Sequence, residues 1–553
     1  MNTLGSFVIS PNQLAITLEG TTLAELDGAL ADLSANTLLV AQRRNKHILA
    51  THTNQDVLEI IFSAVIDRQG SAGLRFVSQV CREWRRVALG APLLWRKALS
   101  LSVNRNWMFE MVRRTMQVPL TIHVSHQGFQ GGVVYTNLLS IADQFWRFET
   151  LEFDAPYPYI CEFFGLVPFD GNEAPHLRVL SLCGQNWQGF PSDEILPDEL
   201  LTLSTPNLER LAVENFPFGW NALTSGLARS IKLSVLHICY HGESEAPHTL
   251  SISELLATLA CMTSLRELKL RNVLKATDGN LFMEWNTPAT VLPALQILDL
   301  QANIQFCSGF LNGVEAPVLV ELDVECNTTD ETSNAHQFMT SPFMIGVSRT
   351  APHNPYDILA AICNKGELWV SLRSSRTGAF CRILLPQANN DLVLECVLRQ
   401  LADMPSVRNT KSLEISLSKD AHNKVAEEAW SYLLERLNSV SSLNLGRYPV
   451  PCILRNLYRN AKGALDAQRQ GGEVSVLLPF LETITVAASS KLCVLVDMIA
   501  ELREPVGAPI DRYVILRGTD TYHALREHVT TWLEGGDPSV QIEDDEENAE
   551  ESD

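Results

Sequence analysis

Two pairs of histidines and several pairs of carboxylates are the residues whose spacing could support chemistry. His123 and His126 are three residues apart, and His237 and His241 are four apart, so each pair could face one metal ion. No thiol or carboxylate set completes either pair. The chain has thirteen histidines, so chance spacing explains these pairs better than a metal centre, and we expect no metal site.

The sequence motifs of common catalytic sites are absent. There is no phosphate-binding GxxxxGK[ST] loop, no GxGxxG, no GxSxG and no HExxH. Asp323 and Glu325 are two residues apart in a segment with the pattern of a strand, so both would point outward from one face. That face is either a solvated polar surface or part of a ligand surface. We therefore expect a protein that is not an enzyme and needs no cofactor.

Charge and hydropathy exclude several classes of partner. The net charge is −21, and residues 543–553 (EDDEENAEESD) carry eight acids and no base, which leaves −13 on the rest. This charge argues against nucleic acid and anionic membranes as main partners. No apolar run approaches the roughly 18 residues of a membrane helix, and the N-terminal MNTLGSFVISPNQ lacks a secretory pattern. We expect an intracellular protein of the cytoplasm, the nucleus or both.

Twelve cysteines are spread along the chain, and none forms a CxxC pair. Several are flanked by leucine or valine. This pattern favours small, buried and reduced side chains over a disulfide framework or a zinc site.

The N-terminal segments have distinct patterns. Residues 1–20 are expected to be flexible, and residues 21–50 to form one amphipathic helix. Leucines with a 3-4-3 spacing make one stripe on that helix, at Leu23, Leu26, Leu30 and Leu33. Two heptads are too few for a stable isolated coiled coil. The stripe either packs on the chain itself, which is the interpretation we prefer, or serves as a dimerisation helix.

Residues 51–102 have the pattern of a compact helical domain. Thr53 or Asn54 can cap the first helix, and Asp56 stands in its first turn, at the end of the helix dipole that favours a negative charge. A domain of about fifty residues needs a partner or a flanking domain to complete its core.

A second apolar stripe follows within the same domain. Residues with three- and four-residue spacing predict one continuous helix from Leu74 to Ala88. Gly90 can end this helix, and Pro92 prevents its continuation.

From about residue 145 a short phrase recurs with apolar residues at its fourth and sixth positions. Seven early copies start 24 to 32 residues apart, three later copies are weaker, and several follow a proline, as in APHL and TPNL. The copies are FETLEFD (148), LRVLSLC (177), LERLAVE (208), LSVLHIC (233), LRELKLR (265), LQILDLQ (295), LVELDVE (319), TKSLEIS (410), VSSLNLG (440) and LETITVA (481).

Each copy predicts a short strand that buries alternate side chains only when strands stack. Stretches such as 251–263 suit return helices. We therefore expect an α/β fold in which residues 145–535 form a curved solenoid of short, mostly parallel strands, least regular over 328–400. A helix over 519–536 would cap it, and residues 536–553 would be a disordered acidic tail.

This repeat pattern resembles a leucine-rich-repeat solenoid of irregular repeat length. Asn303 and Asn327 stand at the ninth position of their repeats, where that family uses Asn or Cys to bond the turning backbone. Asn215 and Asn272 stand one place earlier.

The segment NQDVLEIIF…LRFVSQVCREWRRVALGAPLLW (54–95) resembles an F-box, in the variant common in mushroom-forming fungi. The family pattern opens with Leu-Pro-x-Glu-Ile-Leu and a later Phe, continues with Val-Cys-x-x-Trp, and ends with Leu-Trp. The matching residues are Asp56, Val57, Leu58, Phe62, Val80, Cys81, Trp84, Leu94 and Trp95.

The resemblance implies a partner, the Skp adaptor of cullin–RING ubiquitin ligases. The family's Leu-Pro belongs to the surface that meets this adaptor, and Thr53 and Asn54 stand in its place here. This departure bears on the tightness of adaptor binding rather than on the fold. Trp84 is either an adaptor contact or an internal core residue. The residues assigned to adaptor contact or its support are Val57, Leu58, Ile61, Phe62, Val77, Val80, Trp84, Pro92, Leu94 and Trp95.

An F-box followed by leucine-rich repeats implies a substrate-recognition subunit of an F-box type cullin–RING E3 ubiquitin ligase. The F-box would bind the adaptor and the solenoid an unknown protein target, while the complex supplies catalysis by proximity. The alternative, favoured by Thr53 and Asn54, is a ligase-independent scaffold with a divergent F-box. A hydrolase within residues 328–400 is the least favoured interpretation.

Overall fold

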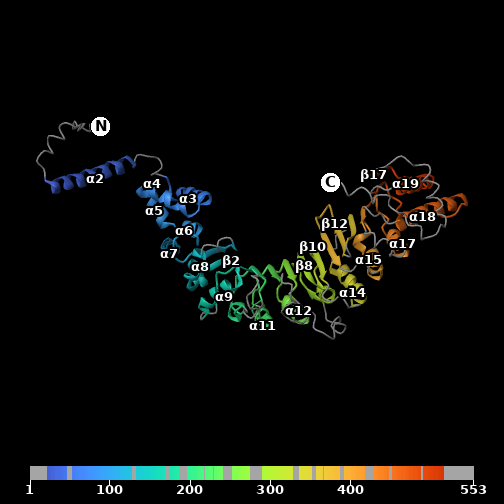
Figure 1. The fold of residues 1–553 in the computed structure, drawn as a ribbon, viewed down its shortest axis with the longest axis horizontal. Helices are drawn as coiled ribbons and strands as arrows, with labels where there is room; N and C mark the ends of the chain where they lie inside the picture. The colour runs from blue at the N-terminus through green and yellow to red at the C-terminus, as the bar shows by residue number, and fades with distance from the viewer. Residues whose placement is uncertain are drawn as a thin grey trace, which may run out of the picture. The chain divides into compact units, whose positions relative to one another are not determined.

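In the structure, which is a computed structural model, the chain folds into two compact units. The helical unit comprises residues 1–121 and 128–140, and the sheet unit comprises 122–127 and 141–553 (Figure 1). The residues described are 22–45, 53–126, 132–169, 173–185, 196–216, 218–227, 229–240, 252–273, 289–327, 335–350, 356–364, 367–385, 391–416, 427–446, 451–486 and 490–515. The expected flexible N-terminus, capping helix and acidic tail lie outside them.

Short helices build the helical unit. The amphipathic helix expected near the N-terminus is present as α2, and Asn54 caps α3 because its side chain accepts a hydrogen bond from the Asp56 backbone N–H. The helices are α2 Leu23–Asn45, α3 Gln55–Gln69, α4 Ser71–Val80, α5 Arg82–Gly90, α6 Pro92–Ala98, α7 Arg105–Arg114 and α8 Val133–Leu139.

The single helix predicted from Leu74 to Ala88 is wrong, because the chain breaks at Cys81. Cys81 has extended backbone angles, and its Sγ accepts a hydrogen bond from the Trp84 backbone N–H at 3.4 Å, so it ends α4 and caps α5. The break lets α4 and α5 fold back on one another and bury their apolar residues in one core. Val80, which a continuous helix would bury, is 55% exposed at the end of α4.

Aromatic side chains fill the core of the helical unit. The Trp95 indole is buried and donates through Nε1 to the Ala88 carbonyl oxygen at 2.8 Å. The Arg114 guanidinium lies over its ring, 4.9 Å from the centroid. The buried Phe62 ring lies 5.1 Å from the half-buried Trp84 ring.

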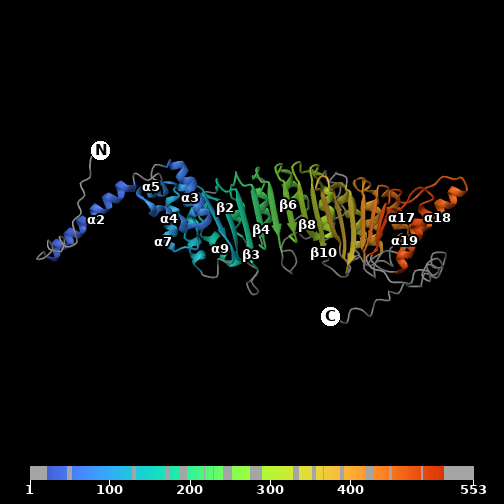
Figure 2. The same cartoon turned by 90° about the horizontal axis from the view of Figure 1, so that it is seen from above.

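A fifteen-stranded sheet dominates the sheet unit, in the order β1-β2-β3-β4-β5-β6-β8-β10-β13-β12-β11-β14-β15-β16-β17 (Figure 2). All ten recurring phrases form strands, so the expectation of an α/β fold with a large, mostly parallel sheet is confirmed. The strands of these phrases are β2 Phe148–Pro156, β3 Val179–Gln185, β4 Arg210–Glu214, β5 Val235–Cys239, β6 Glu267–Arg271, β8 Ile297–Asn303, β10 Glu321–Asn327, β14 Ser412–Ser416, β15 Ser442–Leu445 and β16 Thr483–Val486. The others are β1 Leu120–Val124, β11 Ile358–Asn364, β12 Glu367–Arg373, β13 Phe380–Leu385 and β17 Arg512–Ile515, with β7 Thr290–Val291 and β9 Val314–Glu315 in a separate pair.

The register of neighbouring strands matches the repeat. The leucine at the fourth position of one phrase pairs with the leucine at the fourth position of the next. Leu151 aligns with Leu180, and the ladder continues through Leu211, Leu236 and Leu268. These side chains are at most 5% exposed. A shift of one residue would turn the apolar set to the other face of the sheet, so burial fixes the register.

The proline that precedes several phrases belongs to a turn. In the X-Pro-X-Leu segments, the carbonyl oxygen of X accepts a hydrogen bond from the leucine N–H, as from Leu177 to Ala174 at 3.2 Å and from Leu208 to Thr205 at 3.1 Å. Proline suits the second position of such a turn because its ring fixes φ near −65°. In these repeats the strand begins shortly after the turn.

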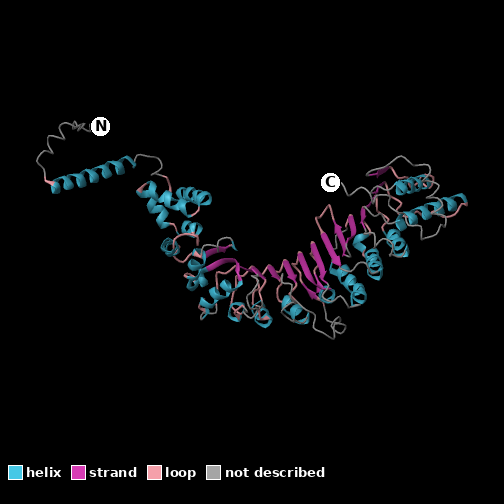
Figure 3. Cartoon of the chain, viewed as in Figure 1, coloured by secondary structure: helices cyan, strands magenta, loops and turns pink. Residues whose placement is uncertain are grey.

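Helices cover one face of the sheet (Figure 3), and neighbouring helices from α10 to α19 pack on one another. α12 occupies the stretch predicted as a return helix. We call the other face of the sheet the open face. The helices are α9 Tyr157–Leu166, α10 Asp198–Leu201, α11 Trp220–Leu227, α12 Ile252–Ala260, α13 Ile304–Gly313, α14 Ala335–Thr350, α15 Asp391–Asp403, α17 Glu427–Arg436, α18 Pro451–Arg469 and α19 Ser490–Arg503, with 3-10 turns η3 Ala142–Arg147 and η6 Pro405–Val407.

The irregular region predicted over 328–400 contains two antiparallel strand pairs, β11 with β12 and β12 with β13. After α14 the chain enters at β11, returns antiparallel as β12, and then forms β13 beside β10. Gly378, with φ of +72°, stands in the turn from β12 to β13, where the Ser374 N–H donates to the Ala379 carbonyl oxygen at 2.8 Å. The repeat phrase is lost because a hairpin needs no return helix.

Asparagines at the ends of strands take three different roles. Asn215 and Asn272 have left-handed backbones, with φ of +61° and +51°, a conformation that asparagine tolerates better than most residues. Asn303 caps α13, because its Oδ1 accepts a hydrogen bond from the Phe306 N–H at 2.8 Å. The Asn327 side-chain amide donates to the side-chain oxygen of Asn272.

Candidate functional site

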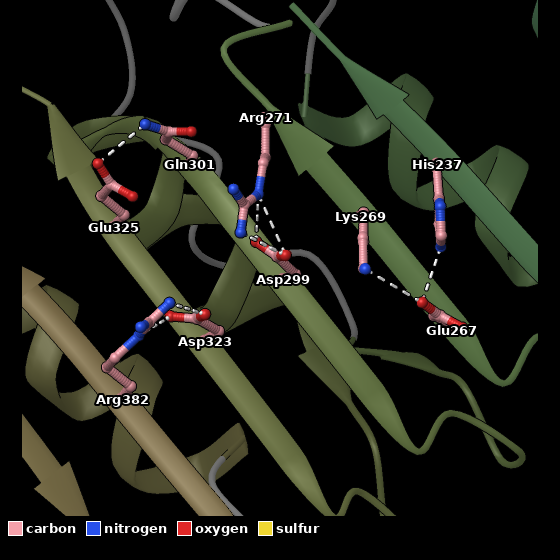
Figure 4. Close-up of polar contacts among 9 residues, drawn as sticks. All are labelled: His237, Glu267, Lys269, Arg271, Asp299, Gln301, Asp323, Glu325 and Arg382. Atoms are coloured by element: carbon pink, nitrogen blue, oxygen red, sulfur yellow. Dashed lines mark hydrogen bonds and ion pairs between the residues drawn. The ribbon is translucent and has the colours of Figure 1, made fainter. Parts of the chain in front are cut away.

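Polar residues alternate with the buried ladder and lie on the open face of the sheet. Asp323 and Glu325 flank the buried Val324 on β10, as the spacing predicted. Figure 4 shows that the same face carries polar side chains from five neighbouring strands, β5, β6, β8, β10 and β13. We call this set the polar ladder: His237, Glu267, Lys269, Arg271, Asp299, Gln301, Asp323, Glu325 and Arg382.

His237 joins two strands at one end of the polar ladder. Its Nε2 lies 2.8 Å from Glu267 Oε1, and Lys269 Nζ lies 3.3 Å from the same oxygen. Burial lowers the pKa of His237 against the opposing attraction of Glu267. Burial raises the pKa of Glu267, but His237 and Lys269 outweigh it and lower that pKa overall. We therefore treat the contact as a hydrogen bond from a neutral imidazole rather than a full ion pair.

Two arginine–aspartate pairs bridge adjacent strands in the middle of the polar ladder. Arg271 on β6 makes a two-pronged contact with Asp299 on β8, with Nη2 to Oδ2 at 2.7 Å and Nε to Oδ1 at 2.9 Å. Arg382 on β13 contacts both carboxylate oxygens of Asp323, with Nε to Oδ1 at 2.8 Å. These hydrogen bonds raise the pKa of each arginine.

Glu325 is the member of the polar ladder with an unneutralised charge. It accepts a hydrogen bond from the Gln301 amide at 2.9 Å, and in the described part of the chain it makes no ion pair. Burial is the main cause that raises its pKa, and the neighbouring carboxylates Asp323 and Asp299 add to the shift. Folding therefore makes Glu325 easier to protonate than it is in the unfolded chain.

Replacing Glu325 by glutamine is expected to raise the thermal stability at pH 7, by about 1 °C in melting temperature. Because the folded pKa lies above the unfolded value, the contribution of Glu325 to stability is full below pH 4.5 and is lost as pH rises through the folded pKa. The advantage of Glu325→Gln should therefore shrink as pH falls toward 4.5. Calorimetric melts of the parent protein and the variant, from pH 7 down to pH 4.5, measure this difference in melting temperature.

Asp323→Asn is the matched control for that experiment, because it removes a carboxylate that has an arginine partner. It should lower the melting temperature at pH 7, opposite in sign to Glu325→Gln. Equal signs for the two variants would contradict the assignment of the unneutralised charge to Glu325.

The described thiols and histidines are the remaining residues whose types could support chemistry. Burial, aided by Glu214 and Asp154, raises the pKa of the Cys183 thiol to about 12, and burial raises that of Cys381 to about 12. No cluster of three or more His, Cys, Asp or Glu in these ranges could hold a metal ion. Cys261 is exposed, which differs from the expectation of buried thiols. His123 bonds Glu152 at 2.8 Å, and His241 lies outside the described residues.

The residues predicted to contact or support an adaptor all belong to the helical unit. Leu58, Phe62, Val77, Leu94 and Trp95 are buried. Trp84 and Pro92 are half-buried, and Val57, Ile61 and Val80 are exposed. The first group supports the fold of α3 to α6, and the last group forms surface.

Further exposed apolar residues extend that surface. Ile60 is 69% exposed on α3, three residues from Val57, and Phe76 is 59% exposed on α4, four residues from Val80. These spacings place each pair on one face of its helix, and α3 and α4 pack together. Sequence reasoning missed Ile60 and Phe76 because neither is among the residues that match the F-box pattern. We call Val57, Ile60, Ile61, Phe76 and Val80 the apolar surface.

The sequence found only part of the polar ladder. Asp323 and Glu325 came from a recognised phrase, whereas Arg382 lies on β13, which has no such phrase. The fifth and seventh positions, compared across all copies, could have found His237, Lys269, Arg271, Asp299 and Gln301, and the third position could have found Glu267. Arg382 also lies over the ring of Trp369, 5.9 Å from its centroid.

None of the helices in the described ranges has the length and apolar character that crossing a membrane requires. No protein-family model matches the chain, and no curated protein matches it. The sites are therefore interpreted from their own geometry.

Proposed function

We propose that this protein is a substrate-recognition subunit of a cullin–RING ubiquitin ligase. In this proposal the helical unit is an F-box that docks on the Skp adaptor, and the sheet unit is a leucine-rich-repeat-like solenoid that holds a protein target. The chain supplies no nucleophile, and the ligase complex delivers ubiquitin to a target lysine held nearby.

The observation that carries the proposal is the apolar surface on α3 and α4. Its five residues are 40–69% exposed although they belong to a small helical unit with a filled core. Exposed apolar residues grouped on packed helices are typical of protein interaction sites. Their positions overlap the residues that the F-box resemblance assigns to the adaptor, which favours this partner over an unspecified one.

The polar ladder is the proposed contact surface for the target. Its charged side chains are held in fixed positions by cross-strand bonds such as Arg271 to Asp299, so they present a set pattern of donors and acceptors. Patterned charge gives specificity more than affinity. We expect this pattern to determine which target binds. Apolar contacts around the polar ladder would supply most of the affinity.

Direct binding to the adaptor tests the proposal. The purified full chain should form a complex with the Skp adaptor that isothermal titration calorimetry detects. An F-box protein that binds this adaptor serves as the positive control. Absence of binding under conditions where the control binds would overturn the proposal.

Restoring the family's Leu-Pro at positions 53 and 54 is expected to tighten adaptor binding by about tenfold, or about 1.4 kcal/mol. Asn54 has φ of −54° and ψ of 143°, which proline can adopt without strain. The double variant Thr53→Leu/Asn54→Pro loses the weak 3.3 Å capping bond to Asp56, so it should lose no more than about 1 kcal/mol of stability. Calorimetric titration and thermal melts measure the two effects separately. Unchanged affinity in a folded variant would show that this end of α3 does not meet the adaptor.

The alternative is a ligase-independent scaffold, favoured by the polar cap Asn54 in place of proline. Proximity labelling in the native cell, with and without proteasome inhibition, separates the two functions. Partners that accumulate only under inhibition support the ligase subunit, whereas partners of unchanged abundance support the scaffold.

A further inference from the structure

Helix α2 is stabilised by its own ends. The Thr22 backbone N–H and side-chain hydroxyl both donate to Glu25 Oε2, each at 2.8 Å, and Arg43 and Arg44 stand in the last turn. Acidic residues at the first turn and basic residues at the last complement the helix dipole. These features stabilise the helix through interactions within the helix itself.

The apolar stripe of α2 is longer than the four leucines suggest. Thr37 and Val40 continue the 3-4-3 spacing of Leu23, Leu26, Leu30 and Leu33, so the stripe spans two and a half heptads. The Thr37 hydroxyl donates to the Leu33 carbonyl oxygen at 2.7 Å, which satisfies it within the helix and leaves its methyl group for packing. The stripe is therefore apolar along its whole length.

This stripe is not covered by the described residues of the helical unit. Leu30 is 61% exposed, Leu33 57% and Val40 69%. The preferred expectation that the stripe packs on its own chain is thus not met among these residues. A single helix of this length, with Gly28 in its first half, is marginal in water without a packing partner.

We propose that α2 pairs with α2 of a second copy of this chain, in antiparallel orientation. The stripe is self-complementary in that arrangement. With the pair centred between residues 31 and 32, Leu30 faces Leu33 of the second copy, and Leu23 faces Val40 of the second copy. All six stripe positions then meet a stripe position of the other helix.

Charge selects the antiparallel orientation over the parallel one. The acids of α2 lie in its first ten residues, at Glu25, Asp27 and Asp32, and its bases lie at its end, at Arg43 and Arg44. Parallel pairing would set like charges side by side at both ends. Antiparallel pairing sets the acidic end of each helix beside the basic end of the other.

Oligomeric state tests the pairing. The full chain should show a concentration-dependent dimer by analytical ultracentrifugation, because two and a half heptads give modest affinity. Leu30→Asp/Leu33→Asp should abolish the dimer. Leu39→Asp, on the opposite side of the same helix, is the matched control and should leave it intact. The variants should bind the Skp adaptor as the parent does, since the apolar surface is untouched.

Disulfide trapping tests the orientation. A chain with Leu23→Cys, mixed with a differently tagged chain carrying Val40→Cys, should form a crosslinked heterodimer under mild oxidation. In a parallel pair these positions would be about 25 Å apart, and Leu23→Cys chains would instead crosslink to one another. The unsubstituted chain gives the background from native cysteines.

A monomer at all concentrations, or a dimer that survives Leu30→Asp/Leu33→Asp, would overturn the proposal. Crosslinking of Leu23→Cys chains to one another, without the mixed product, would overturn the antiparallel orientation. Loss of the dimer in Leu39→Asp as well would show that the stripe is not the interface.

Discussion

Adaptor binding is expected to fall at least about a hundredfold, or about 2.8 kcal/mol, when Val57 and Ile61 are both replaced by aspartate. Both side chains are exposed on one face of α3, so the variant should fold. At the proposed interface each aspartate would be desolvated against apolar groups without a partner. Calorimetric titration of the full-length variant with the purified adaptor measures the loss.

Phe109→Asp provides the matched control for this loss. Phe109 is 40% exposed, the same as Ile61, but lies on α7 and is not one of the residues of the apolar surface. The control should bind the adaptor within about twofold of the parent protein. An equal loss in both variants would point to damaged folding, and full binding by Val57→Asp/Ile61→Asp would place the adaptor elsewhere.

Trp84→Ala would be a less informative test of adaptor binding than these variants. The Trp84 ring packs on the buried Phe62, and its backbone N–H donates to Cys81 Sγ. Removing the ring would leave a cavity in the helical unit, which costs stability. Loss of adaptor binding in that variant would mix a folding defect with a lost contact.

The second large effect is expected at Arg503, where Arg503→Leu should destabilise the end of the sheet unit by roughly 3 kcal/mol or more. Arg503 is fully buried and donates to three backbone carbonyl oxygens. They belong to Leu477 at 2.7 Å, Leu478 at 2.7 Å and Ala508 at 3.1 Å. Leucine fills the space but leaves these acceptors unsatisfied. Burial lowers the pKa of Arg503 to about 10, so the side chain still carries its charge at neutral pH.

Native-state hydrogen exchange at the amides of β16 and α19 measures this local loss, and faster exchange there is the expected result. Arg469→Leu is the control, because Arg469 on α18 is an exposed residue 3.8 Å from Asp466. Its effect should stay within about 0.5 kcal/mol. Equal exchange rates in Arg503→Leu and the parent would show that the three carbonyls find other partners.

The strands could be predicted because their signal is local. Each phrase contains its own alternation of buried and outward side chains, as at Leu322, Asp323 and Val324. The X-Pro-X-Leu turns add a second local signal, since proline restricts the backbone before each strand. The α2 helix was predictable for the same reason, from its leucine spacing.

The strands β11 to β13 could not be predicted, because pairing between distant segments selected their direction. The register that brings Arg382 beside Asp323 joins residues 59 positions apart, and no short pattern records it. The break at Cys81 is similar, because a continuous apolar stripe favours one helix. Only packing of α4 against α5 makes two helices better.

The sequence by itself determined that the ten recurring phrases form strands, which side of each of these strands is apolar, and where α2 lies, because short-range periodicity encodes these features. Only the tertiary structure decided which polar residues meet on the open face and which apolar residues remain exposed. Those outcomes depend on how side chains are buried and how strands pair between segments that are far apart in the chain. The apolar surface, the polar ladder and the uncovered stripe of α2 all belong to this second kind.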